Sequence, residues 1–343
     1  MTAVVATRRS RRSLELVLKI LAVAACYYVA GRLGLVSQVD VEGVVVTPIW
    51  PPTGVSVAAL LVLGVGVWPG IALGCFLVIA SITTPEFTVL VNVAGSTVAP
   101  LCSFLLLRRI GFRLDISRLR DGLALVFLGG LGAMLISATT GAGLQVLTGD
   151  LDSGEFWAVW LAWWVGDAMG VLLVTPLLLL VVGAGELDWG RRWPEAVCLG
   201  AVALVLVPLA AFASTSLLFL VYPLVIWAAL RFQLAGSMMC ALYASVLTTY
   251  SANTTSGAFL GLSDVDTMVK LQAFNGATAL TALLLSSLVT EQIATRRSVE
   301  NACGELQELL DHLAAGETPP ETPPRHIAAP APGPRSPRPR APG

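Results

Sequence analysis

The sequence predicts an all-α fold: a polytopic bundle of about ten transmembrane helices (eight to ten), with both chain ends in the cytoplasm. Apolar residues make up 56% of the chain and charged residues only 13%, whereas a soluble globular domain carries about 25% charged residues. Apolar segments of about 17 to 25 residues, the length that crosses a bilayer, follow one another along most of the sequence. Lys and Arg residues gather at every second junction between these segments, which is the pattern of loops retained in the cytoplasm.

The distribution of charge orients the bundle. Arginines precede the first apolar segment, fill the loop at 108–120 and follow the last segment at Arg296 and Arg297. The junctions between them carry acidic residues instead, such as Asp40 and Asp150. Because short translocated loops lack Lys and Arg, we expect the acidic junctions on the outer side.

The apolar segments predict the helices in chain order. The second and third are short, and we expect the chain to turn between them at Trp68-Pro69. Two short spans keep the arginine-rich loop inside, and a re-entrant hairpin at 51–83 is equally compatible. The expected helices are 14–35, 51–68, 69–83, 87–107, 121–147, 156–183, 195–213, 216–230, 233–250 and 267–289.

Tryptophan–proline pairs predict where three of these helices begin. Proline fits the first helical position, where its missing N–H costs nothing, and tryptophan favours the headgroup level of a membrane. The pairs are Trp50-Pro51, Trp68-Pro69 and Trp193-Pro194. Trp50 is also a candidate for binding, because it lies on the outer side near Thr47 and Thr53.

Glycines and prolines within the spans are assigned to packing. Glycines four residues apart let two helices approach closely, and Pro176 predicts a kink in the 156–183 span, with Thr175 placed to satisfy part of the freed backbone. The structural set is Pro51, Pro52, Gly54, Pro69, Gly70, Gly74, Gly166, Gly170 and Pro176.

The composition changes after Thr290. A heptad pattern of apolar residues predicts a cytoplasmic stalk helix at 291–315. The Pro- and Arg-rich segment 316–343 lacks the apolar residues needed to bury a core, so we expect disorder. The predicted organisation is therefore a basic N-terminus at 1–13, a transmembrane domain at 14–290, the stalk and the tail.

Asp167 is the strongest functional candidate. It lies about eleven residues into the 156–183 span, so a rise of about 1.5 Å per residue places it near the bilayer centre. A charge there costs about 3 kcal/mol or more unless it is paired, protonated or facing a polar cavity. Both a ligand-contacting or proton-sensing carboxylate and a structural hydrogen bond or ion pair stay open.

Other polar residues fall in the outer halves of neighbouring spans. Arg32 and Lys270 are positive charges away from the basic side. They either snorkel to the interface or pair with Asp167 or an anionic ligand. We expect an outward-opening pocket whose ligand-binding or signal-sensing candidates are Trp50, Asn92, Asp167, Arg32, Lys270 and Asn275.

No pattern in the sequence indicates catalysis. The two histidines lie in the polar C-terminal part and the six cysteines are scattered singly, so we expect no metal site, disulfide framework or cofactor. No phosphate-binding glycine loop or nucleophile–base pair is present. The expected surroundings are the lipid bilayer, with no nucleic acid partner and no enzymatic activity.

A series of short motifs runs through the apolar part in a fixed order. They are Ile49–Gly54, Leu63-Gly64, Trp68–Ile71, Asn92–Ser96, Trp164–Gly170, Thr175-Pro176, and Pro223 with Trp227–Ala229 and Arg231. In this order and spacing the chain resembles the MASE1 family of bacterial integral-membrane sensor domains, over about residues 14–295. The resemblance implies a sensory input domain in the bacterial cytoplasmic membrane, usually fused to an output such as a histidine kinase or a diguanylate cyclase.

No such output domain follows the stalk in this sequence. The resemblance therefore implies either a signalling partner in trans, reached through 291–315, or a truncated or repurposed sensor; a homodimer also stays open. A small-solute transporter, or the membrane subunit of one, is the alternative. About ten spans, short broken helices and a mid-membrane carboxylate suit transport, although no inverted repeat is apparent.

Overall fold

The computed structural model describes residues 2–41, 44–83, 87–183, 193–213 and 215–314. The predicted disordered tail at 316–343 lies outside these residues. The chain divides into two compact units, Met1–Gln292 and Ile293–Gly343.

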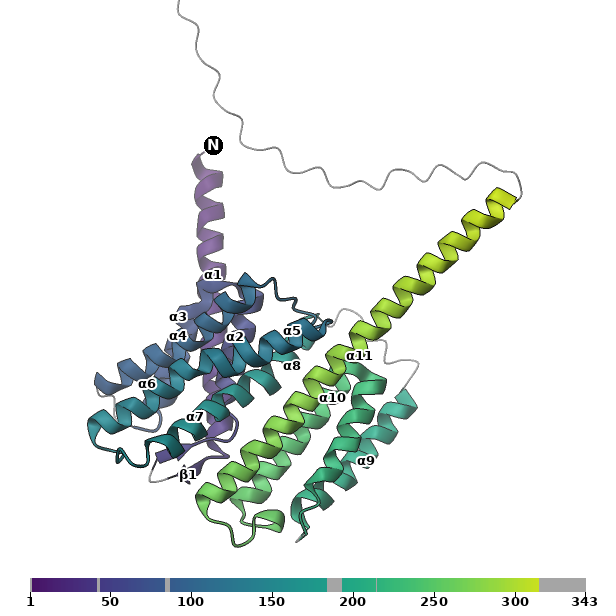
Figure 1. The fold of residues 1–343 in the computed structure, drawn as a ribbon. Coiled ribbons are helices and arrows are strands. Elements are labelled where there is room, and N and C mark those ends of the chain that lie inside the picture. The colour runs from purple at the N-terminus through teal and green to yellow at the C-terminus, as the bar shows by residue number, and fades with distance from the viewer. Residues whose placement is uncertain (1, 42–43, 84–86, 184–192, 214, 315–343) are drawn as a thin grey trace, which may run out of the picture. The chain divides into compact units, whose positions relative to one another are not determined.

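The described residues form an all-α fold with one small β-hairpin that the sequence did not indicate (Figure 1). The hairpin joins β1 (Val39–Val41) to β2 (Val44–Val46), with Val39 opposite Val46. The helices are α1 (Thr2–Leu35), α2 (Pro51–Leu63), α3 (Trp68–Ala80), α4 (Phe87–Arg109), α5 (Leu119–Ala124), α6 (Ala133–Thr148), α7 (Phe156–Met169), α8 (Thr175–Gly183), α9 (Trp193–Phe212), α10 (Val221–Asn253) and α11 (Asp264–Ala314).

Seven helices among the described residues are long and apolar enough to cross a membrane. They span Arg12–Leu35, Phe87–Arg109, Leu119–Thr148, Phe156–Gly183, Trp193–Phe212, Leu218–Asn253 and Asp264–His312. Two shorter apolar helices, Pro51–Leu63 and Val65–Ala80, lie between the first two. The predicted helical membrane bundle is confirmed, with fewer long helices than the ten predicted segments because 216–250 forms one element and 51–83 forms two short ones.

The long element α10 is broken at Gln233, whose φ of 53° and ψ of −138° are not helical. Arg231, before the break, pairs with Glu195 near the start of α9. Tyr250, after the break, packs against Phe212 at the end of α9. The Leu218–Leu220 turn that leads into α10 also packs against α9. The first limb of α10 therefore runs back along α9 and the second limb runs forward again. The two limbs thus follow the predicted segments 216–230 and 233–250.

The two short helices α2 and α3 turn at Gly64, and the predicted turn at Trp68-Pro69 was wrong. Gly64 has a φ of 85°, a backbone region that glycine reaches without strain. A single 3₁₀ turn, Val65–Val67, then leads into α3. Trp68 begins α3 rather than ending the helix before it. The predicted starts at Trp50-Pro51 and Trp68-Pro69 are confirmed, since α2 begins at Pro51 and α3 at Trp68; the described part of α9 begins at Trp193.

Two of the long spans contain π-helical segments. Leu125–Gly132 lies between α5 and α6, and Gly170–Val174 lies between α7 and α8, directly before Thr175 and Pro176. The irregularity expected near Pro176 takes this π-helical form. From the sequence we expected Thr175 to satisfy part of the backbone freed by Pro176. Instead its hydroxyl donates to the Gly54 carbonyl of α2 at 3.1 Å, so it links two helices.

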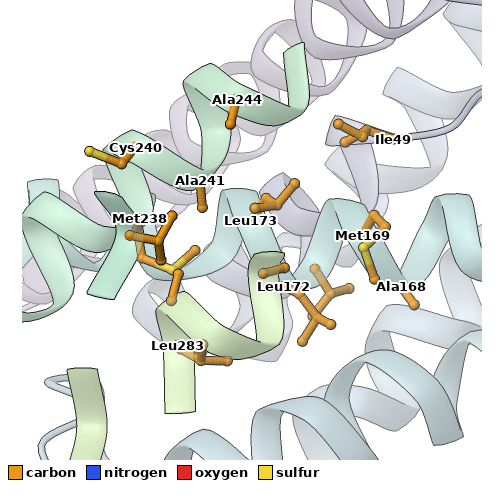
Figure 2. Packing of buried hydrophobic residues seen from close by; sticks show 14 of the residues in the cluster. Ile49, Ala168, Met169, Leu172, Leu173, Met238, Cys240, Ala241, Ala244 and Leu283 are labelled. Carbon is orange, nitrogen blue, oxygen red and sulfur yellow. The ribbon is translucent and has the colours of Figure 1, made fainter. Parts of the chain in front are cut away.

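The main apolar core lies where α7, α10 and α11 meet (Figure 2). Leu172 and Leu173 from the 156–183 span face Met238 of α10 and Leu283 of α11, and small alanines of α10 let the helices approach. A second cluster joins α1, α2 and α3 and includes Tyr27. The site described below lies in the first unit, beside this second cluster.

The helical part of the second unit is the C-terminal portion of α11. Its apolar side chains are exposed: Val299 is 56% exposed and Leu306 is 61% exposed. An ion pair between Arg296 and Glu300, at 2.8 Å and one helical turn apart, lies on its surface.

Candidate functional site

The segment that begins α2 crosses the 156–183 span at backbone contact. The Trp50 N–H donates to the Gly166 carbonyl at 2.9 Å. A Cβ atom at Gly166 would lie 2.3 Å from the Thr47 carbonyl oxygen, and one at Gly170 would lie 1.9 Å from the Trp50 carbonyl oxygen. No side chain fits at either position, so these glycines allow the two backbones to touch.

Asp167 lies between these two glycines and is buried, with 2% of its surface exposed. Its carboxylate accepts a hydrogen bond from the Ser137 hydroxyl of α6. Its backbone carbonyl accepts a hydrogen bond from Thr53 of α2 at 2.9 Å. Among the residues that the structure describes, Asp167 takes part in no ion pair. The carboxyl group is therefore held in place without a basic partner.

Beside Asp167 lies a cavity of about 150 Å³. It is bounded by α1, the β-hairpin, the start of α2, α3, α4 and α7. The lining residues are Tyr27, Leu35, Val45, Val46, Thr47, Trp50, Cys75, Val78, Ile79, Ile82, Asn92, Ser96, Trp163, Gly166 and Asp167. The structure thus brings together three of the predicted site residues, Trp50, Asn92 and Asp167, from separate parts of the chain.

The wall of the cavity is mostly apolar, with a few polar groups in defined positions. Tyr27, Trp50 and Trp163 contribute aromatic rings. Asn92 and Ser96 lie one turn apart on α4, and the Ser96 hydroxyl donates to the Asn92 side-chain oxygen at 3.3 Å. A concave apolar site with few polar groups is typical of small-molecule binding.

The two predicted cations do not line this cavity. Arg32 is exposed and donates to the Ser81 hydroxyl at 3.2 Å. Lys270 donates to the Ala258 carbonyl at 2.6 Å, and its ammonium group lies 5.5 Å from the centre of the Phe259 ring. Neither forms an ion pair with Asp167.

Asn275 also lies away from the cavity. It is fully buried on α11, and neither its amide nitrogen nor its oxygen has a hydrogen-bond partner among the described residues. Gln272, one turn earlier, donates to the Ala162 carbonyl of α7 at 2.8 Å. This part of α11 therefore contacts the helix that carries Asp167.

Several residues of the site were not among the predicted candidates. Tyr27 and Cys75 line the cavity from α1 and α3, and Ser137 holds the carboxylate from α6. Ser137 belongs to a polar run with Thr139 and Thr140 inside an apolar span, which is a signal that the sequence does carry. Within the described part of the chain, no group of three or more His, Cys, Asp or Glu residues is placed to hold a metal ion.

The MASE1 family model matches residues 20–293. No curated protein and no solved structure is significantly similar to the chain.

Proposed function

Because the chain belongs to the MASE1 family of membrane-associated sensory domains, we propose that it recognises a small ligand in the cavity beside Asp167 and signals to a partner protein. The convergence of Trp50, Asn92 and Asp167 on this cavity is the observation that carries the proposal. In this role the protein is not an enzyme and needs no cofactor. Its place is the bacterial cytoplasmic membrane, with lipid around the bundle.

A direct contact between α7 and α11 supports a route for the signal. Trp163 and Asp167 face the cavity, and the carbonyl of Ala162 on the same helix is bonded to Gln272 of α11. A ligand that shifts α7 would therefore displace α11. Because α11 is one continuous helix from Asp264 to Ala314, the displacement would reach the stalk predicted at 291–315. Such a sensor needs two packings of similar free energy, so that ligand binding can favour one of them.

We infer about ten crossings, with both ends of the chain in the cytoplasm. The reversal of α10 at Gln233 supports this topology, because it adds one crossing to the long helices. The helices α2 and α3 have 13 residues each and are about 20 Å long, less than the hydrocarbon core of about 30 Å. Whether each of the two crosses the bilayer or the pair forms a re-entrant hairpin, the chain leaves the pair on the side from which it entered. The orientation of the other helices is therefore the same in both cases.

Labelling of single cysteines in a variant without native cysteines tests this topology. A membrane-impermeant thiol reagent applied to intact cells should label Asp152→Cys and leave Gln233→Cys and Arg113→Cys unlabelled until the cells are opened. Labelling of Gln233→Cys from outside would contradict the topology.

Mass spectrometry of the protein extracted in native lipid discs tests the proposed function. We expect a bound small molecule and a stoichiometric signalling protein with the wild type, and the native mass also reports a homodimer. Asp167→Asn should fold normally and lose the small molecule, whereas the control Asp152→Asn, at an exposed position, should keep it. Deletion of 291–343 should lose the protein partner and keep the small molecule.

Two results would overturn the proposal. If Asp167→Asn retains the small molecule with wild-type occupancy, the cavity is not the recognition site. If no protein partner is found and reconstituted vesicles take up the bound solute in a manner that depends on Asp167, the chain is a transporter.

A further inference from the structure

The charge of the cavity beside Asp167 is not balanced by the residues around it. The carboxyl group receives a neutral hydrogen bond from Ser137, and no Lys, Arg or His of the described residues lines the cavity. The nearest predicted cation, Arg32, is directed to Ser81 instead. Burial disfavours the charged form of an acidic group, and an opposite charge close to it favours that form, so a cation that enters the site would stabilise the Asp167 carboxylate.

Aromatic rings from three parts of the fold surround the same space. Tyr27 lies on α1, Trp50 precedes α2 and Trp163 lies one turn before Asp167 on α7. The faces of Trp and Tyr rings carry negative electrostatic potential and attract ammonium groups, most strongly where water is excluded. The aromatic rings and the carboxyl group therefore both favour a positively charged ligand.

The cavity also limits the size of the ligand. Its volume of about 150 Å³ is close to that of an apolar protein cavity that holds a benzene molecule. The aliphatic side chains of Leu35, Val78 and Ile79 leave most of the wall without hydrogen-bonding groups. A ligand that fits has one apolar ring, or a short chain of similar volume, and a single polar end.

From these observations we propose that the cavity binds a small organic cation: a protonated amine whose ammonium group meets the Asp167 carboxylate and whose apolar body lies among Tyr27, Trp50 and Trp163. This inference rests on the proposed function, because it assigns a chemical class to the ligand of the same cavity. An anion would meet the carboxylate with no compensating charge. A neutral molecule would bring no opposite charge to stabilise the carboxylate.

Three compounds of nearly equal shape distinguish the effect of a ligand's charge on binding from the effect of its size. Benzylamine, benzyl alcohol and benzoate carry a positive, a neutral and a negative end on the same ring. Their equilibrium binding is measured with the purified protein in lipid nanodiscs, and empty nanodiscs correct for partition into lipid. We expect saturable binding of benzylamine, at least about tenfold tighter than that of the other two, which is a common consequence of a hydrogen bond to a charged group.

Two variants locate the binding. Asp167→Asn should weaken benzylamine at least about tenfold and leave benzyl alcohol unchanged, because only the charge is removed. Ser96→Phe fills the cavity and leaves the carboxyl group in place, so it should abolish the binding of all three compounds. Asp152→Asn, which removes an exposed carboxylate elsewhere, is the matched control and should bind as the wild type does. The comparison of three compounds on the wild type needs no variant, so it stands even if a variant fails to fold.

Each opposite result has a separate meaning. Benzyl alcohol or benzoate binding as tightly as benzylamine would overturn the cationic class and leave the cavity as a ligand site. Unchanged benzylamine binding in Asp167→Asn would also overturn it. Absence of saturable binding for all three would overturn a ligand of this size and charge. Co-purification of a signalling partner tests the sensory function independently.

Discussion

Replacement of Gly170 by alanine tests whether direct backbone contact holds the site together. The new Cβ atom would lie 1.9 Å from the Trp50 carbonyl oxygen, whereas ordinary contact begins at 3.4 Å. The start of α2 would have to move away by about 1.5 Å, the difference between these distances. That movement stretches the hydrogen bond between the Trp50 N–H and the Gly166 carbonyl, now 2.9 Å, beyond bonding distance.

The expected loss of unfolding free energy is about 2–4 kcal/mol. Overpacking of a well-packed site costs about 1–3 kcal/mol, and the lost hydrogen bond adds about 1 kcal/mol. The measurement is unfolding of the detergent-solubilised protein by increasing fractions of SDS, followed by tryptophan fluorescence. Gly143→Ala on α6 is the matched control, because nothing lies within 4 Å of its new Cβ atom; it should not destabilise the protein, and the higher helix propensity of alanine should raise its stability by up to about 1 kcal/mol. If Gly170→Ala is as stable as this control, the close crossing does not exist as described.

Three further substitutions probe buried and exposed polar groups in the same unfolding assay. Ser137→Ala removes the hydroxyl that donates to the cavity carboxylate and should cost about 1–3 kcal/mol; unchanged stability would show that the bond contributes nothing. Asn275→Ala deletes a buried amide with no described partner. It should therefore lower the free energy of unfolding by less than Leu271→Ala in the same helix, for which a loss of about 2–5 kcal/mol is expected. Equal losses for the two variants would indicate that the amide is hydrogen-bonded. Glu195→Gln weakens an ion pair with Arg231 whose side chains are 41% and 44% exposed, so the loss should stay below about 1 kcal/mol and shrink with added salt, and a larger, salt-independent loss would contradict this.

Local chemistry allowed much of the fold to be predicted from the sequence. The length and composition of the apolar segments indicated a helical membrane bundle, because a backbone in lipid must satisfy its own hydrogen bonds. Tryptophan–proline pairs marked the starts of α2 and α3, since proline is favoured at the first helical position whatever the rest of the chain does. The MASE1 motifs were recognisable for the same reason, as each consists of neighbouring residues.

The turns within the apolar segments were harder to predict. From the sequence we expected the turn between α2 and α3 at Trp68-Pro69, but the chain turns at Gly64, where the backbone takes a positive φ. The reversal at Gln233 uses a positive φ in a residue other than glycine, which local preference disfavours. The limbs on either side of Gln233 contact α9 through Arg231 with Glu195 and Tyr250 with Phe212, and such long-range contacts cannot be read from neighbouring residues.

The candidate site divides in the same way. The sequence by itself determined that Asp167 is an acidic group deep in an apolar span, because depth follows from position along a helix. Only the tertiary structure decided its neighbours: it brought Trp50 and Asn92 to Asp167, and placed Lys270 and Asn275 elsewhere. Helical periodicity gives the face on which a residue lies but not which helix covers that face. That choice depends on where the helices can approach, and here glycines at the crossing with α2 allow two backbones to touch.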